Sequence, residues 1–239
     1  MPHPPFFRFG EHASLMWNAH QKMCDISANM AINELGAISD AYTKTLEVVA
    51  SLASRTEGKF APIVDPKLSQ RDAILSGYIV GLTLVEHAIL SGYCAQAAAL
   101  VRQELEAIAA LEEIRLGKRK DGKTPHIRHV PSVPRTIYGD LSKAAHFSDT
   151  PTLRLLTAYR GEVPDAPGPA EIFLLSPQHI PNTTRQLFAL HTLLLLNFAE
   201  HQSTHYSDLH AINPTEFDIR AVDESLALLR AAGVIEISE

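Results

Sequence analysis

The chain has 239 residues, of which 46% are hydrophobic and 20% are charged. This composition is typical of a globular protein and excludes disordered and fibrous classes. The formal net charge of −6 argues against a surface built throughout for nucleic acid, and the two cysteines, Cys24 and Cys94, are too few for a disulfide-rich secreted scaffold. We expect a cytoplasmic protein.

The N-terminal half of the chain predicts long helices. Residues 1–10 lack the basic and apolar segments of a secretory signal, and we expect a short extended arm there. From Glu11 to about Glu57, apolar residues recur at helical spacing, which predicts one long helix or two consecutive helices with a joint at 33–36. A loop rich in Gly and Pro is expected at 58–66.

The stretch from Ser69 to Leu116 contains no proline and predicts a very long helix or two helices end to end, with Ser69 as the N-terminal cap. A continuous helix of this length would span about 70 Å, which is long for a domain of this size. We therefore expect a break near Ser91 and Gly92.

The first part of this stretch has two further properties. Residues 73–101 are apolar over a length that spans a bilayer, but Glu86 and His87 lie in the middle, and we expect a buried core helix and no membrane contact. Gly77 and Gly81 form part of a small-residue surface on which another helix can approach closely. We expect the protein to associate with itself, as a dimer, through such faces.

The second half predicts shorter elements. A basic loop is expected at 117–134, then a short helix from Arg135 to about 147 and a further turn at 153–159. A second loop rich in Pro and Gly is expected at 161–182, with a brief extended piece at IFLL. A third major helix, capped by Asn182 or Thr183, runs to about 210.

The last predicted helix covers 216–232, with Ile219, Val222, Leu226 and Leu229 directed inward. No run alternates with period two for long enough to predict a sheet. Long consecutive helices with short connections indicate an all-α protein. We predict an up-and-down multi-helix bundle with two long N-terminal helices, formed as a single helical domain over residues 1–239.

Two helical segments carry polar residues at spacings of four. Arg102 and Glu106 share one helix face, and Tyr138, Ser142 and His146 share another. If the two faces meet, these five residues form a polar cluster. Such a cluster either fixes how the two helices dock or binds a small polar ligand, and these five residues are also the first candidates for catalysis.

These residues carry a family resemblance. LVRQELEAIAALEEI followed by YGDLSKAAHF resembles a large group of uncharacterised bacterial helical proteins, in which Arg-x-x-x-Glu and Leu-Ser-x-x-x-His recur on neighbouring helices. The resemblance covers roughly residues 77–146, with Phe147 departing from the pattern. It implies a helical fold and a bacterial origin rather than a particular reaction.

Proteins of this group are similar in outline to the HEPN superfamily, which includes metal-independent endoribonucleases of toxin and phage-defence systems. The resemblance implies an Arg followed four to six residues later by a His, so that a cation holds the phosphate and an imidazole moves protons. Arg185 and His191 match this form, which makes RNA a second expected partner. The match is close to what chance gives in a chain with 12 His.

The long C-terminal helix also carries weak metal candidates. His201 and His205 are one turn apart, and Asp208 lies three residues further on the same side. Two His at this spacing also occur in helices that bind no metal, and the segment lacks a His-Glu-x-x-His motif. We expect neither a metal nor a cofactor, and whether the chain is an enzyme stays open.

Overall fold

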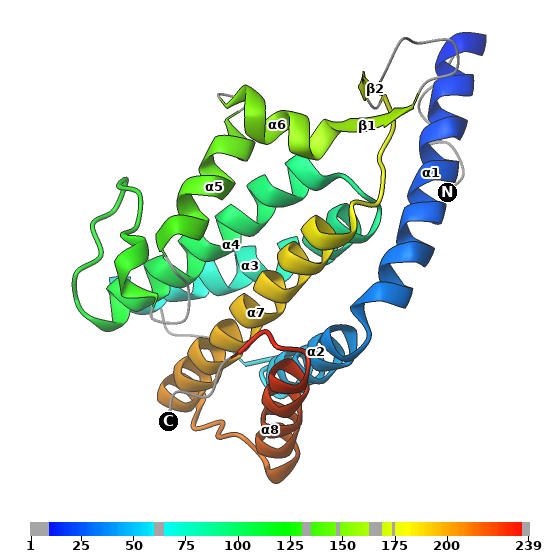
Figure 1. Ribbon diagram of the computed structural model, residues 1–239. Coiled ribbons are helices and arrows are strands. Elements are labelled where there is room, and N and C mark those ends of the chain that lie inside the picture. Colours follow the sequence, from blue (N-terminus) through cyan, green and yellow to red (C-terminus); the bar gives the residue numbers. More distant parts are fainter. Residues whose placement is uncertain are drawn as a thin grey trace.

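The computed structural model describes residues 10–59, 65–130, 135–146, 149–162, 169–173 and 175–235. Helices dominate this part of the chain, and a short antiparallel hairpin accompanies them (Figure 1). The elements are α1 Glu11–Leu35, α2 Ala37–Ser54, α3 Pro66–Leu90, α4 Cys94–Arg115, the 3-10 helix η1 Ile127–His129, α5 Arg135–Ala145, α6 Thr150–Thr157, β1 Ala158–Glu162, β2 Pro169–Phe173, α7 Pro181–His210 and α8 Glu216–Ala231. The all-α bundle predicted from the sequence is confirmed.

α7 runs through the middle of the bundle and contacts α1, α2, α3 and α4 (Figure 1). Its apolar segment is buried on several sides, with Phe188, Leu194 and Phe198 at most 1% exposed. The predicted cap at Asn182 or Thr183 is wrong, because the helix begins at Pro181 and Ile180 is its N-cap. Proline suits the first helical position because it lacks the N–H that this position leaves unpaired. The predicted end near residue 210 is confirmed.

The predicted joint between the first two helices is confirmed at Gly36, which separates α1 from α2. Gly36 has φ +47° and ψ −120°, a conformation that residues with a Cβ rarely adopt. The joint lets α1 stand at one edge of the molecule while α2 packs beside α8 (Figure 1). The predicted N-terminal arm lies mostly outside the described residues, which begin at 10.

The predicted break near Ser91 and Gly92 is also confirmed, because α3 ends at Leu90 and α4 begins at Cys94. The predicted start of α3 at Ser69 is wrong. Asp65 caps the helix by accepting a hydrogen bond from the Lys67 N–H, so α3 includes one turn more than expected.

α3 buries only one of its faces. Leu75, Tyr78 and Leu82 lie in the core, whereas Val80 is 81% exposed and Leu84 is also exposed. Within the described residues, α3 alone is long and apolar enough to cross a membrane, with a mean hydropathy of 1.7. Core helices of soluble proteins also reach this length and hydropathy. The expectation of a buried core helix is therefore met on one face of α3 and not on the face that carries Val80 and Leu84.

The segment between α4 and α7 differs most from the predictions. η1 interrupts the loop predicted at 117–134. β2 (Pro169–Phe173) lies within the region predicted as a loop at 161–182, and it includes Ile172 and Phe173 of the extended piece predicted there. β1 (Ala158–Glu162), which pairs antiparallel with β2, begins within the turn predicted at 153–159. The strands are too short for period-two alternation to reveal them, because five residues give only two or three side chains on each face.

α8 begins with a capping box in which Thr215 and Asp218 bond reciprocally, so that Glu216 is its first helical residue as predicted. Leu229 is fully buried, but Ile219 is exposed, contrary to the prediction. The buried hydroxyl groups of Thr45 and Ser225 lie 2.8 Å apart and join α2 to α8. These two helices are therefore held together by polar as well as apolar contacts.

Gly92 gives a test of the helix break. Its φ is +81°, and a Cβ there would lie 2.6 Å from the backbone carbon of Gln178. We expect Gly92→Ala to lower the free energy of unfolding by at least about 2 kcal/mol, seen as a fall of several degrees in a thermal melt. Gly139→Ala is the control, because Gly139 lies in α5 with nothing within 4 Å, and should melt at or slightly above the wild-type temperature. An unchanged melt for Gly92→Ala would contradict the proposed constraint.

Candidate functional site

The structure brings four of the five residues of the predicted polar cluster into direct contact. Arg102 Nε donates to Glu106 Oε1 at 3.0 Å within α4. Arg102 Nη2 donates to the Tyr138 hydroxyl at 3.1 Å, and that hydroxyl donates to Glu106 Oε1 at 2.8 Å. We call Arg102, Glu106, Tyr138 and His146 the Arg102 cluster, and it joins α4 to α5.

His146 completes the Arg102 cluster at its solvent-exposed edge. Arg102 Nη1 lies 2.7 Å from His146 Nε2. Because a guanidinium only donates hydrogen bonds, Nε2 must accept, and the neutral ring then carries its proton on Nδ1. The Arg102 Cζ atom also lies 5.1 Å from the centre of the Tyr138 ring, within the range of a cation–π contact.

The surroundings of Arg102 in the cluster favour its charged form. Burial alone would lower the pKa of Arg102, but the hydrogen bond to Tyr138 and the charge of Glu106 outweigh it and raise that pKa above its ordinary value. The Arg102 and Glu106 side chains are 19% and 25% exposed, so solvent screens the pair only in part. Mutual hydrogen bonding of this kind fixes the position of α5 on α4.

Ser142, the fifth predicted residue, stands apart from these contacts. It lies one helical turn from Tyr138 and from His146 on α5. Its Oγ atom is buried and has no hydrogen-bond partner among the described residues. Ser142 therefore takes no part in the hydrogen bonds of the Arg102 cluster.

Arg185 and His191, the alternative catalytic pair, do not face a common cleft. Arg185 Nη2 donates to the backbone carbonyl of Ala232 at 2.7 Å, which fastens the end of α8 to α7. His191 is fully buried, and its Nδ1 lies 2.8 Å from Glu104 Oε2. In this arrangement both residues serve the packing of the bundle.

The buried Glu104–His191 pair is a feature that the sequence predictions missed. The Tyr42 ring lies tilted beside His191, with ring centres 5.2 Å apart, and the Tyr42 hydroxyl donates to Glu86 at 3.2 Å. Burial, followed by the charge of Glu86, raises the pKa of Tyr42 well above its ordinary value. A signal existed, since Glu104 falls on the apolar row of Val101, Leu105 and Ile108, where a carboxylate needs a buried partner.

The metal candidates on α7 form three separate pairs. His201 Nε2 lies 3.3 Å from Glu112, His205 pairs with Asp72, and Asp208 pairs with Arg71 at 3.5 Å. Burial lowers the pKa of His201 despite the nearby carboxylates of Glu112 and Glu200, which favours its neutral form. Within the described ranges, no three or more His, Cys, Asp or Glu side chains gather in a way that could hold a metal ion.

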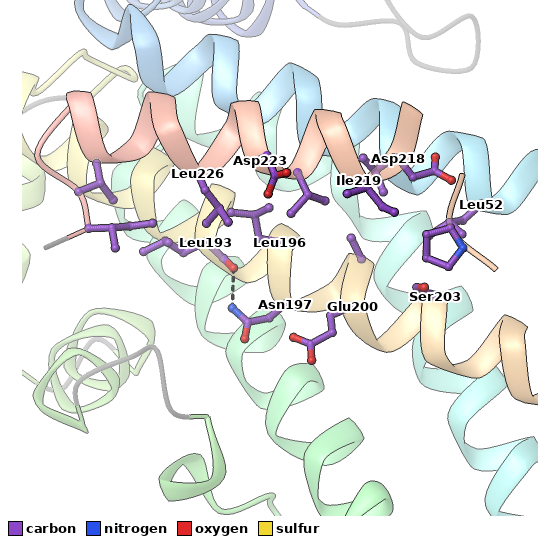
Figure 2. Close-up of a pocket in the computed structure, with 16 residues that line it drawn as sticks. Leu52, Leu193, Leu196, Asn197, Glu200, Ser203, Asp218, Ile219, Asp223 and Leu226 are labelled. Atoms are coloured by element: carbon purple, nitrogen blue, oxygen red, sulfur yellow. Dashed lines mark hydrogen bonds between the residues drawn. The ribbon is translucent and has the colours of Figure 1, made fainter. Parts of the chain in front are cut away.

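A groove between α2, α7 and α8 is the second feature absent from the sequence predictions. It has a volume of about 790 Å³, within the range of small-molecule sites. Figure 2 shows Leu193 and Leu196 of α7 facing Leu226 of α8 across it. Each of these residues belongs to an apolar helical row, so the sequence alone would assign them to a filled core.

Comparisons of the chain with protein-family models, with curated proteins and with solved structures found no match. The resemblance to the bacterial helical group and to HEPN proteins therefore stays a prediction.

The Arg102 cluster predicts a specific loss of stability. Glu106→Ala removes the acceptor shared by Arg102 and Tyr138, and leaves a mostly buried guanidinium without its carboxylate. We expect the free energy of unfolding to fall by about 1–3 kcal/mol, measured by denaturant unfolding.

Asp140→Ala is the matched control for this change. Asp140 pairs with Lys143 on the exposed side of α5, and both side chains are mostly open to solvent. Its replacement should change the free energy of unfolding by less than about 0.5 kcal/mol. Equal effects of the two substitutions would show that the Arg102 cluster does not fix the docking of α5.

Proposed function

We propose that the protein is a self-associating helical interaction module. The observation that carries this proposal is the exposed apolar stripe along α1. One face of α1, with Cys24, Ala31 and Leu35, packs against the bundle. Another face carries large apolar side chains that are exposed, which is unusual for a helix of a monomeric protein.

The stripe is continuous along the helix. Its members are Leu15, Ala19, Met23, Ile26 and Met30, at spacings of four, four, three and four residues. At 100° per residue, these positions lie within about 80° of the helix circumference. Leu15 is 61% exposed, Met30 50% and Ile26 40%, so the stripe has the geometry of a helix-pairing surface.

A second copy of the chain is the occupant that fits the stripe. In an antiparallel pair of α1 helices, Leu15 would face Met30 of the partner, and Ala19 would face Ile26, because the spacing is nearly the same in both directions. Such self-complementarity is what a two-fold interface requires.

The charges beside the stripe support the same pairing. Lys22 and Asp25 are both exposed and lie on one flank of it, and neither forms an ion pair with another described residue. In the antiparallel arrangement Lys22 of each copy would approach Asp25 of the other. The two copies would therefore contribute two reciprocal ion pairs.

The small-residue face predicted on α3 offers a second open surface. A Cβ added at Gly77 or Gly81 would meet nothing within 4 Å, so no described helix uses the close approach that these glycines allow. Val80 and Leu84 beside them are exposed. α3 contacts α1 within the same chain, and we place its open face second to the longer stripe of α1.

Self-association gives a sharp mutational test. We expect sedimentation velocity at several concentrations to show a dimer, and Ile26→Asp to weaken it about a hundredfold or more because a carboxylate would be buried. Lys22→Asp should weaken the dimer about tenfold by placing like charges together, and adding Asp25→Lys should restore it.

Val80→Asp serves as the comparison for the α3 face. It should leave the dimer intact if α1 forms the interface. A dimer lost in Val80→Asp but kept in Ile26→Asp would move the interface to α3. A wild-type protein that stays monomeric at about 100 µM would contradict the proposal, because this concentration is far above the typical dissociation constants of specific dimers.

Metal-independent RNA cleavage at His146 is a second candidate function. The observation that favours it is the 2.7 Å contact between Arg102 Nη1 and the exposed His146 ring, which sets a cation for phosphate beside a group that moves protons. The charge of Glu106 opposes phosphate binding at the same place. For this reason the candidate stands second.

Incubation with total RNA in the presence of a chelator tests this candidate. Cleavage by the wild-type protein that His146→Ala abolishes, and that His12→Ala retains, is the expected result, since His12 is exposed on α1 away from the Arg102 cluster. RNA that stays intact with folded wild-type protein, or cleavage that survives in His146→Ala, would exclude catalysis at this site.

A further inference from the structure

The groove between α2, α7 and α8 is formed by helices other than α4 and α5, which carry the Arg102 cluster. Val234 and Ile235, which follow α8, close one part of it. Figure 2 shows lining side chains of α7 and α8 facing each other along the groove, with Asp218 and Leu52 at one end. The groove is therefore a separate site, and it is independent of the self-association proposed above.

The groove changes in character from its floor to its rim. Val48, Leu52 and Ala199 at the floor are almost completely buried. Glu200 and Asp223 are exposed at the rim, and each comes from a different helix. A ligand that fits would place an apolar body on the floor and a polar group at the rim.

The net charge of the lining residues is negative. The sixteen lining residues include three carboxylates, Glu200, Asp218 and Asp223, and no Lys, Arg or His. Asp218 is occupied elsewhere, because it pairs with Arg55 and caps α8. Although burial opposes it, hydrogen bonds from Thr215 and Ser51 and the charge of Arg55 hold the pKa of Asp218 below its ordinary value.

Glu200 and Asp223 form no ion pair with any described residue, so their two negative charges at the rim are not neutralised. Asn197 and Ser203 stand one helical turn from Glu200 on α7 and add hydrogen-bonding groups to the same wall. A carboxylate or phosphate ligand would meet like charge here. An ammonium or other organic cation would meet opposite charge.

We propose that the groove between α2, α7 and α8 binds a small organic cation with an apolar body, whose charged group lies at the rim beside Glu200 and Asp223. The volume of about 790 Å³ admits a molecule of drug size. The apolar floor supplies most of the affinity, and the two carboxylates select the sign of the charge.

Two ions of matched shape test this proposal directly. Tetraphenylphosphonium and tetraphenylborate have nearly the same size and apolar surface, and opposite charge. We expect isothermal titration calorimetry of the full chain to show saturable binding of tetraphenylphosphonium at one site per chain. Its binding should be at least about tenfold tighter than that of tetraphenylborate, and this preference should weaken as salt is added.

Three variants locate the binding. Leu226→Trp fills the groove and should abolish binding. The double variant Glu200→Gln with Asp223→Asn changes only exposed carboxylates, will fold, and should remove most of the preference for the cation. Glu47→Gln is the control, because Glu47 is an exposed carboxylate of α2 outside the groove, and should bind as the wild type does.

Each other result overturns the proposal. Equal binding of the two ions would show an apolar groove without charge selection. A preference for the cation that the double variant keeps would place the ion elsewhere on the acidic surface. The absence of binding by folded wild-type protein would exclude this class of ligand.

Discussion

The burial of α7 is the constraint on which the rest of the structure depends. A helix with apolar side chains on most of its circumference is stable in water only when other helices surround it. α1, α2, α3 and α4 meet this requirement, and the hydrogen bond between His191 Nδ1 and Glu104 Oε2 pairs two of the polar atoms that the burial traps. The groove follows from it, since it lies on the side of α7 where α2 and α8 leave that helix incompletely covered.

The sequence predicted those features that depend on local chemistry. Gly36 and Gly92 end their helices because their backbone conformations suit glycine, and such positions are visible in a single chain. The β1–β2 hairpin was missed because its strands are short. The exposure of Ile219 was missed because helical periodicity shows which residues share a face, whereas the neighbours of that face are set by distant segments.

The same distinction applies to the candidate sites. Spacings of four placed Arg102 with Glu106 and Tyr138 with His146, and the packing of α5 on α4 then brought the two faces together. No spacing rule could have predicted the groove, since three helices from different parts of the chain line it. Arg185 and His191 match a catalytic motif in sequence, whereas in the structure Arg185 donates to a backbone carbonyl and His191 is buried beside Glu104.

The hydroxyl contact between Thr45 and Ser225 has a consequence for synthesis of the protein. These residues are 180 positions apart in the chain, and the contact belongs to the close packing of α2 on α8. During translation, α2 leaves the ribosome well before α7 and α8, so its apolar face stays uncovered until these two helices follow. The order of synthesis therefore exposes α2 to aggregation before its union with α8.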